Sequence, residues 1–240
     1  MKSLLDYHTH TVASSHAYST VMENAKSASE MGLSLIAITD HAPAMEDTPH
    51  ELHFMNYRVM PKTLFGVDML YGAELNIVDY EGNLDLCEEI WQGMDICIAG
   101  FHPVVLAPGS RAENTRAMIG AMQNPYVSVL AHPEDGHIPV DFEELVRQAK
   151  ASVVLLEVNN NSLKNAVFRL NVRENIIDML RLCEKYGAMI SLGSDAHFAL
   201  SVGDFTEAET LLREFDFPRE LVINTDPDAF KNHVKGKRPA

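Results

Sequence analysis

The chain has 240 residues, of which 46% are hydrophobic and 22% charged, and its formal net charge is -15. This length supports one sizeable hydrophobic core, so we expect a single domain over residues 1–240. The acidic excess argues against binding to long nucleic acid or to an acidic membrane surface, because both attract Lys and Arg. No apolar run of about 18 residues occurs, and Asp6 and His8 interrupt the N-terminal segment, which predicts a cytoplasmic chain without a secretory leader.

Short apolar runs alternate along the chain with segments of helical periodicity. The apolar runs predict strands at residues 4–7, 35–39, 69–73, 96–99, 127–131, 153–158 and 189–192, with a weaker run at 221–224. Seven strands that are buried on both faces and mostly followed by helices predict a parallel α/β sheet. In a domain of this length, seven or eight such units favour a closed (β/α) barrel, with a doubly wound open sheet as the alternative.

The helical segments lie between these strands. The predicted helices run from Ser19 or Thr20 to Met31, over 142–150 behind Asp141, over 172–186 before Gly187, and over 204–215. Ser19 or Thr20 and Asp141 are suitable N-caps, and the glycines Gly32 and Gly187 at helix ends are typical of C-caps. A turn at Glu81 and Gly82 indicates a short hairpin within 75–86, whereas the poorly patterned residues 43–66 are predicted as a long connection or lid.

Histidine and carboxylate residues follow the predicted strands at the points where the strands end. The C-terminal ends of parallel barrel strands meet at one face, so we expect these side chains to converge there. Neither a GxGxxG stretch nor a Walker loop accompanies them, which argues against nucleotide-binding folds. The converging residues are His8, His10, His16, Asp40, His41, Glu74, His102, His132, Asp195 and His197.

The chemistry of this set predicts a metal site. His8 and His10 are two residues apart, as are Asp195 and His197, so each pair can point to one side of an extended strand. Imidazole and carboxylate ligands without thiolates suit zinc, iron or manganese, whereas magnesium and calcium prefer oxygen ligands. The ligands exceed what one or two tetrahedral ions need, so we expect up to three divalent ions, zinc first among them, with Glu74 bridging two. The alternative is a separate structural role for each histidine.

Six stretches carry a resemblance to a known family. "DYHTHTVASSHAYST", "AITDHAP", "GAELNI", "AGFHP", "LAHP" and "GSDAH" resemble, in that order, the metal-binding motifs of the PHP (polymerase and histidinol phosphatase) superfamily, with YcdX-like bacterial phosphatases most similar. The resemblance covers nearly the whole chain and implies a distorted (β/α)7 barrel, TIM-barrel-like, with a trinuclear metal site. One metal would take His8, His10, Glu74 and Asp195, a second Glu74, His102 and His132, and a third His16, His41 and His197.

The resemblance also implies an activity. We expect a metal-dependent phosphatase in which a metal-bound hydroxide attacks the phosphorus of a small phosphorylated substrate. Histidinol-phosphate phosphatase is the specific alternative, and a phosphodiesterase or nuclease acting on short oligonucleotides is another. A non-catalytic metal-binding module and a metal-dependent hydrolase of C–N or C–O bonds represent different classes. The sequence leaves the substrate and the oligomeric state open.

Individual residues receive predicted roles. Asp195 and His197 are the candidates for catalytic residues, and Asp40 either assists proton transfer or supports a neighbouring ligand. Glu157 and Asn159 are predicted to line or support the pocket. The HELH segment at 50–53 is interpreted as surface or lid, and His137 and His233 as residues outside the site. The candidates for substrate contacts are Arg58, Arg111, Lys164 and Arg169.

Overall fold

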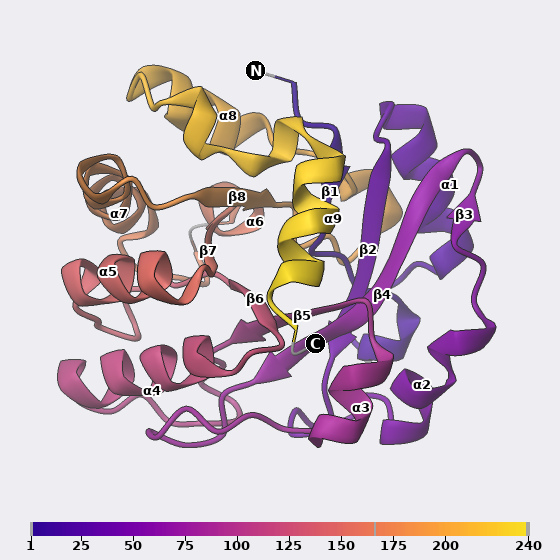
Figure 1. The fold of residues 1–240 in the computed structure, drawn as a ribbon, viewed down its shortest axis with the longest axis horizontal. Helices are drawn as coiled ribbons and strands as arrows, with labels where there is room; N and C mark the ends of the chain where they lie inside the picture. The colour runs from indigo at the N-terminus through magenta and orange to yellow at the C-terminus, as the bar shows by residue number, and fades with distance from the viewer. Residues whose placement is uncertain (1, 166, 239–240) are drawn as a thin grey trace.

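A single sheet organises the fold of the computed structural model, which describes residues 2–165 and 167–238. Its strand order is β1-β2-β4-β5-β6-β7-β8, all parallel, with the short β3 paired antiparallel to β4 (Figure 1). This is the predicted barrel-type α/β class rather than a doubly wound sheet. The strands are β1 (Leu5–Asp6), β2 (Leu35–His41), β3 (Thr63–Leu64), β4 (Val67–Asn76), β5 (Ile96–Gly100), β6 (Val127–Leu130), β7 (Leu155–Asn159) and β8 (Ile190–Gly193).

The edge strands β1 and β8 approach each other and nearly close the barrel. A single parallel bridge joins Thr9 to Ala196 beyond the two strands. Within the seam, the buried side chain of Asn224 accepts a hydrogen bond from the Leu192 N–H (2.7 Å) and donates to the carbonyls of Leu192 (2.8 Å) and Leu5 (3.3 Å). The side chain of Asn224 therefore replaces the ladder hydrogen bonds that the two edge strands do not form directly.

The weak strand predicted at 221–224 is wrong. Its residues form parts of two 3-10 turns, Arg219–Leu221 and Ile223–Thr225, with only one parallel bridge, between Val222 and Ile190. The physical reason is that Asn224 bridges the seam with its side chain, so the backbone of residues 221–224 does not pair as a strand with its neighbours. The apolar character of the run reflects burial in the seam.

Helices surround the sheet (Figure 1). The caps predicted for three of them are present. Thr20 caps the first helix through a capping box with Glu23, and Gly32 ends it with φ 74°. Asp141 accepts hydrogen bonds from the backbone of the helix that follows it, and Gly187 ends another helix with φ 63°. The helices are α1 (Val21–Met31), α2 (Glu51–Met55), α3 (Glu88–Gly93), α4 (Arg111–Gln123), α5 (Phe142–Ser152), α6 (Asn160–Lys164), α7 (Val172–Tyr186), α8 (Thr206–Glu214) and α9 (Pro227–Gly236).

Other segments add to the prediction or refine it, among them the short helices α3 and α6 and the C-terminal α9, which the sequence analysis did not predict. Residues 43–66 contain α2, a 3-10 turn (Asn56–Val59) and β3, so the long connection has structure of its own, anchored by buried Phe54 and Tyr57. Helix α4 was not predicted because its buried face consists largely of small and polar residues rather than a periodic apolar stripe. The hairpin within 75–86 is present in minimal form, as one antiparallel bridge between Ile77 and Leu84.

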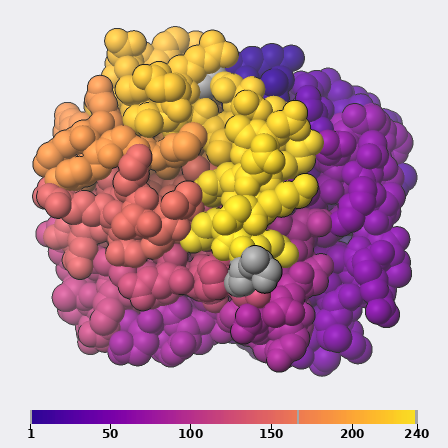
Figure 2. Space-filling view, in the orientation of Figure 1, coloured from indigo at the N-terminus to yellow at the C-terminus, as the bar shows by residue number. Residues whose placement is uncertain are grey.

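Helix α9 covers the amino end of the barrel (Figures 1 and 2). Its buried Phe230 stacks on Tyr7 with ring centroids 5.5 Å apart, and Val234 joins the same apolar cluster inside the sheet. That cluster includes Leu35 and Ile96, the first residues of β2 and β5, which identifies this end as the amino end. No helix among the described residues has both the length and the apolar character needed to cross a membrane.

Candidate metal centre

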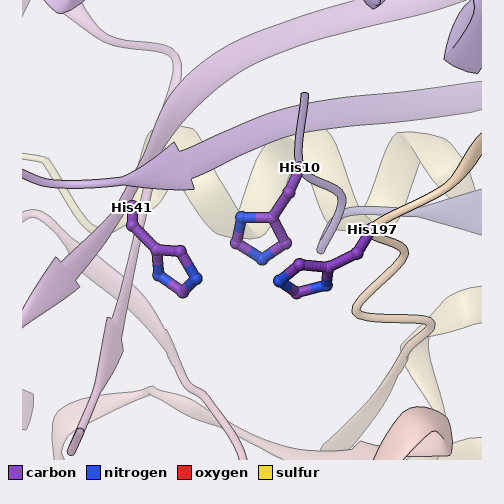
Figure 3. A group of neighbouring side chains, drawn as sticks. All are labelled: His10, His41 and His197. Carbon is purple, nitrogen blue, oxygen red and sulfur yellow. The ribbon is translucent and has the colours of Figure 1, made fainter. Parts of the chain in front are cut away.

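The opposite, carboxyl end of the barrel brings the nine predicted ligands together. His41 is the last residue of β2 and pairs in register with Glu74 of β4. Figure 3 shows the rings of His10, His41 and His197, which come from three separate segments, turned toward one another. The other ligands follow their strands as predicted: His8 and His16 after β1, His102 after β5, His132 after β6, and Asp195 after β8.

Glu74 lies at the centre of this cluster and is fully buried. Its Oε2 is 3.3 Å from His8 Nε2, 3.5 Å from His10 Nε2 and 2.9 Å from His41 Nδ1. His8 and His10 follow β1 and His41 ends β2, and these two strands are neighbours in the sheet. One carboxylate oxygen therefore meets three ring nitrogens.

The second oxygen of Glu74 faces the other side of the cluster. Its Oε1 is 3.1 Å from His102 Nε2 and 2.7 Å from His132 Nε2. His102 Nδ1 is 2.7 Å from Asn76 Oδ1, and the Asn76 amide donates to the Ala42 carbonyl. Because Asn76 presents its oxygen, His102 donates through Nδ1 and keeps Nε2 for the cluster. The sequence analysis missed Asn76, whose position two residues after Glu74 on the same strand was the available signal.

A third part of the cluster lies nearer the surface. His10 Nε2 is 3.3 Å from Asp195 Oδ1, and the rings of His16 and His197 have centroids 4.6 Å apart. Three triplets have donor atoms within 4.8 Å of one another: His10, His41 and His197; His8, His10 and Glu74; and His41, Glu74 and His102. Each of His10, His41 and Glu74 belongs to two of these triplets. The donor atoms therefore form a more continuous cluster than the three ligand sets that the family resemblance implies.

The donor atoms of this cluster fit cations. Of the nine buried side-chain atoms that have no hydrogen-bond partner within residues 2–165 and 167–238, four belong to this cluster: His8 Nε2, His10 Nε2, His41 Nδ1 and Glu74 Oε2. Leaving several buried polar atoms unsatisfied costs free energy, and such groups in native proteins usually have a partner. Divalent transition metals bind the nitrogen lone pairs and carboxylate oxygens that are left over here.

The electrostatics keep the carboxylates ionised. Burial raises the pKa of Glu74, but the charges of His102, His8 and His41 outweigh it and hold that pKa well below its usual range. Burial, followed by the charges of His41 and His197, lowers the pKa of His10 well below its usual value. At His8 burial lowers the pKa, but the charges of Glu157, Glu74 and Asp195 outweigh burial and raise that pKa well above its usual value. An ionised carboxylate and a neutral imidazole are the forms that ligate metals, so metal binding at His8 would release a proton.

Glu157 supports the cluster through hydrogen bonds to two of the predicted ligands, His8 and His132. Its Oε1 accepts from Tyr7 Oη (2.9 Å) and from His8 Nδ1 (2.8 Å), and its Oε2 accepts from the His132 N–H (2.8 Å). A carboxylate on Nδ1 fixes the tautomer of His8 and leaves Nε2 as the free lone pair. Gly193 makes room for it, since a Cβ there would come within 1.8 Å of Glu157 Oε1. The predicted supporting role of Glu157 agrees with this geometry.

Asp40 points away from the cavity. Its Oδ1 accepts from the Thr11 N–H (2.7 Å) and Ser14 Oγ (2.6 Å), and its Oδ2 accepts from Thr11 Oγ1 (2.8 Å). Burial raises its pKa, but His53, whose Nε2 lies 3.8 Å from Oδ2, the charge of His10 and the hydrogen bonds of Ser14 and Thr11 lower it to about 2. Such a carboxylate is a poor proton acceptor. Its geometry supports the second of its two predicted roles, which is to hold the loop that carries His10 and His16.

A cavity of about 290 Å³ opens onto the cluster. Arg169, one of the four predicted substrate contacts, lines it with Nη2 3.7 Å from Asp195 Oδ2 and Nη1 3.6 Å from Glu134 Oε1. A volume at the lower end of the usual range for ligand sites suits a small molecule. Besides predicted ligands, the cavity is lined by Met45, Asn161, Ser162, Asn165, Phe168 and Arg169.

The other predicted substrate contacts lie elsewhere. Arg58 is exposed on the 3-10 turn after α2, Arg111 pairs with Asp141 at 3.2 Å, and Lys164 pairs with Asp204 at 2.6 Å. None of the three is among the described residues that line the cavity. These positions correct the prediction, since a cation in a sequence gives no sign of which face of the fold it reaches.

The remaining histidines also lie outside the cavity lining, as predicted. His50 caps α2 by accepting from the Leu52 N–H, and His53 Nε2 is 3.1 Å from Tyr57 Oη, so the HELH segment forms local structure. His233 Nε2 is 3.1 Å from a backbone carbonyl at the other end of the barrel. His137 Nδ1 is 2.9 Å from Asp135 Oδ1. None of the four lines the cavity, although His53 Nε2 lies 3.8 Å from Asp40 Oδ2, behind the loop that carries His10 and His16.

Comparison with known proteins shows the family. The PHP domain family model matches residues 6–233. The chain is 45% identical over 237 residues to a "Probable phosphatase" of Clostridium novyi (strain NT), covering 99% of this chain and 96% of that protein. It is also 45% identical over 238 residues to a "Probable phosphatase" of Acetivibrio thermocellus, with 99% and 98% covered.

Among solved structures, the fold is similar to that of histidinol phosphate phosphatase from Lactococcus lactis, solved with zinc, L-histidinol and phosphate. The TM-score is 0.63 at 18% identity, covering 91% of this chain and 95% of that one. At this identity the likeness concerns the fold, which agrees with the nearly closed barrel described above. The family-model match and the extent of sequence identity establish that the chain belongs to the PHP domain family.

Proposed function

We propose that this chain is a metal-dependent phosphatase that hydrolyses a small phosphomonoester. The observation that carries the proposal is the arrangement around Glu74, where five imidazoles approach the two oxygens of one buried carboxylate and several donor atoms lack hydrogen-bond partners among the described residues. The names of the relatives from Clostridium novyi and Acetivibrio thermocellus point to the same activity.

The nine ligands would hold up to three divalent ions. Zinc is the first choice because histidine dominates the donor set and because the Lactococcus lactis protein was solved with zinc, with iron or manganese as alternatives. Bound ions of this kind supply positive charge for a phosphate group and lower the pKa of water. The proposed sets are His8, His10, Glu74 and Asp195; Glu74, His102 and His132; and His16, His41 and His197.

Other residues of the chain would bind and orient the ester. The guanidinium of Arg169 lies next to Asp195 at the cavity and can donate two hydrogen bonds to phosphate oxygens. Asp195 and His197 line the cavity and remain our candidates for catalytic residues. In the reaction, water adds to phosphorus, the bond from phosphorus to the alcohol oxygen breaks, and a proton from water ends on the alcohol.

Histidinol phosphate is the second candidate substrate, favoured by the fold shared with the Lactococcus lactis phosphatase. A nuclease acting on short oligonucleotides is less well supported, because the cavity is small and the chain is strongly acidic. A purely structural metal module is also less well supported. Asp195, His197 and Arg169 line an accessible cavity, whereas structural metal sites are closed by protein ligands.

Metal analysis combined with an aryl phosphate assay tests the proposal. The purified protein should hold about two to three zinc, iron or manganese ions per chain. Removal of these ions by a chelator should abolish hydrolysis of p-nitrophenyl phosphate, and their return should restore it. Metal-loaded protein that hydrolyses neither p-nitrophenyl phosphate nor any other phosphoester in a broad panel would refute the proposed function.

A further inference from the structure

The cavity has a second wall that is separate from the nine predicted ligands. Apart from Met45, the residues of this wall belong to α6 and the segment that follows it, residues 160–169. A phosphate held at the metal cluster leaves its alcohol group to contact this wall. The chemistry of the wall therefore indicates which alcohols the site accepts.

Two amides on this wall form a pair. Asn165 Nδ2 donates to Asn161 Oδ1 at 2.5 Å, across one turn of α6. This contact leaves the Asn161 amide nitrogen as a donor and the Asn165 amide oxygen as an acceptor. Ser162 is already engaged, because its Oγ donates to Asn159 Oδ1 and accepts from Arg169. Apart from Arg169, which is assigned to the phosphate, the free hydrogen-bonding capacity of the wall is thus a neutral donor and a neutral acceptor, which match a hydroxyl group.

An aromatic ring lies beside the amides. Phe168 lines the cavity and is 81% exposed, although large aromatic side chains are usually buried. A ring in this position can cover the apolar face of a bound sugar ring or alkyl chain. Amides beside an exposed aromatic ring suit a hydroxylated alcohol that also has a C–H face.

The charge on this wall disfavours a cationic alcohol. Among the described residues that line the cavity, the only carboxylates are Glu74 and Asp195, which belong to the predicted ligand set. Glu134 is fully buried and lies beside the Arg169 guanidinium. An ammonium group on the alcohol would therefore meet Arg169 without a carboxylate of its own, which costs free energy.

We infer that the leaving alcohol is neutral and hydroxylated, with its hydroxyl groups on the Asn161–Asn165 pair and its C–H face on Phe168. Alcohols that carry an ammonium group are disfavoured by this wall, and because histidinol is one of them the inference argues against histidinol phosphate, the second candidate substrate. The inference rests on the proposed phosphatase function and adds the substrate class to it. It assigns Asn161, Asn165 and Phe168 as residues that determine specificity.

Matched substrates that differ by one group test the inference. Glucose 6-phosphate and glucosamine 6-phosphate differ by a hydroxyl in place of an ammonium, as do glycerol 3-phosphate and its 1-amino analogue. With metal-loaded protein, kcat/KM should favour the hydroxyl member of at least one pair by about tenfold or more, equivalent to about 1.4 kcal/mol. Calorimetric titration with the non-hydrolysable phosphonates of the glucose pair should show the same preference in Kd without turnover.

An engineered carboxylate sharpens the test. Asn165→Asp places a counter-ion on the wall and should move the preference at least about tenfold toward the ammonium substrate. Asn161→Asp serves as a second variant at the same pair, should the first not fold. Asn232→Asp, at an exposed position on α9 beyond the barrel, is the matched control and should leave the ratio unchanged.

The outcomes separate the inference from the proposed function. Hydrolysis of p-nitrophenyl phosphate with equal or better use of the ammonium substrates would overturn the inference and leave the phosphatase function standing. Hydrolysis of p-nitrophenyl phosphate with both hydroxylated esters untouched would do the same. Absence of hydrolysis of every phosphoester by metal-loaded protein would overturn both.

Discussion

The two ends of the barrel use the same strands but differ in how their polar groups are satisfied. At the amino end, Phe230 of α9 packs on Tyr7, and the side chain of Asn224 makes three hydrogen bonds across the seam. At the carboxyl end, His8 and Glu74 keep buried atoms that have no partner within the described part of the chain. The difference indicates that the amino end stabilises the fold, while the carboxyl end keeps free ligand atoms for binding.

The largest expected effect comes from His10→Ala at the carboxyl end. This change removes one ligand, so kcat/KM for p-nitrophenyl phosphate should fall at least about a hundredfold and the metal content should drop. The melting temperature of the chelated protein should change little, since among the described residues the His10 ring loses only a long contact, 3.4 Å from Nδ1 to Ser14 Oγ, and Nε2 has no hydrogen bond. His233→Ala, at the other end, is the control and should keep both metal and activity. Full turnover by the His10 variant would remove this residue from the site.

Asn224→Leu in the seam should lower the stability of the fold instead of the metal content and activity. Loss of the three side-chain hydrogen bonds leaves buried backbone groups without partners, so the free energy of unfolding should fall by about 3 kcal/mol. For a chain of this size, that corresponds to a melting temperature lower by about 10 °C. Calorimetry measures both quantities, with Asn232→Leu on exposed α9 as control. An unchanged melting temperature would show that the seam is held by other contacts.

Glu157→Gln should weaken metal binding through His8. A carboxylate accepts at both oxygens, whereas an amide offers one acceptor and two donors, so one of the contacts to Tyr7, His8 or the His132 N–H must be lost. Loss of a partner that orients a ligand typically costs about tenfold or more in metal affinity. Competition with a zinc-binding dye measures the affinity. Glu88→Gln on the outer surface, where Glu88 accepts from Tyr126 Oη, is the matched control; equal affinities in the two variants would contradict the role of Glu157.

The smallest expected effect on stability comes from a carboxylate on the outer surface of the helices, Glu143. Hydrogen bonds from Tyr186, Lys185 and Arg147 lower the pKa of Glu143 on α5 to about 2, below the usual value of 4.5 for a glutamate. Because the pKa of Glu143 is lower in the folded state than in the unfolded state, its ionised carboxylate stabilises the fold at pH values above the unfolded pKa. This stabilisation is lost as the pH falls through the folded pKa. Glu143→Gln should therefore lower the melting temperature slightly at pH 7, and the difference should shrink between about pH 4.5 and pH 2. A difference that persists at the lowest pH would point to packing instead of charge.

The parts of the fold that could be predicted are those with local causes. Continuous apolar runs predicted the seven main strands, and Thr20, Asp141 and Gly187 predicted helix ends, because burial on both faces and capping leave direct marks in the sequence. The convergence of the ligands followed from the topology, since parallel strands end at one face. That is why residues as distant as His8 and Asp195 could be assigned to one site.

The parts that could not be predicted depend on tertiary neighbours. Asn224 resembles any other polar residue until the seam forms around it, and the buried face of α4 carries no apolar stripe. Arg169 and Arg111 are equivalent as charges in the sequence, yet only the first lies at the cavity. Likewise, the pairing of Asn161 with Asn165 becomes meaningful only once α6 is placed beside the ligands.

Anomalous X-ray diffraction from crystals of the purified protein tests the central claim most directly. Data collected on both sides of the zinc, iron or manganese absorption edge should show peaks beside Glu74, with ring nitrogens of His8, His102 or His132 at about 2.0–2.2 Å from them. Crystals of active protein whose anomalous maps are empty throughout the Glu74 cluster would contradict a metal-binding carboxyl end.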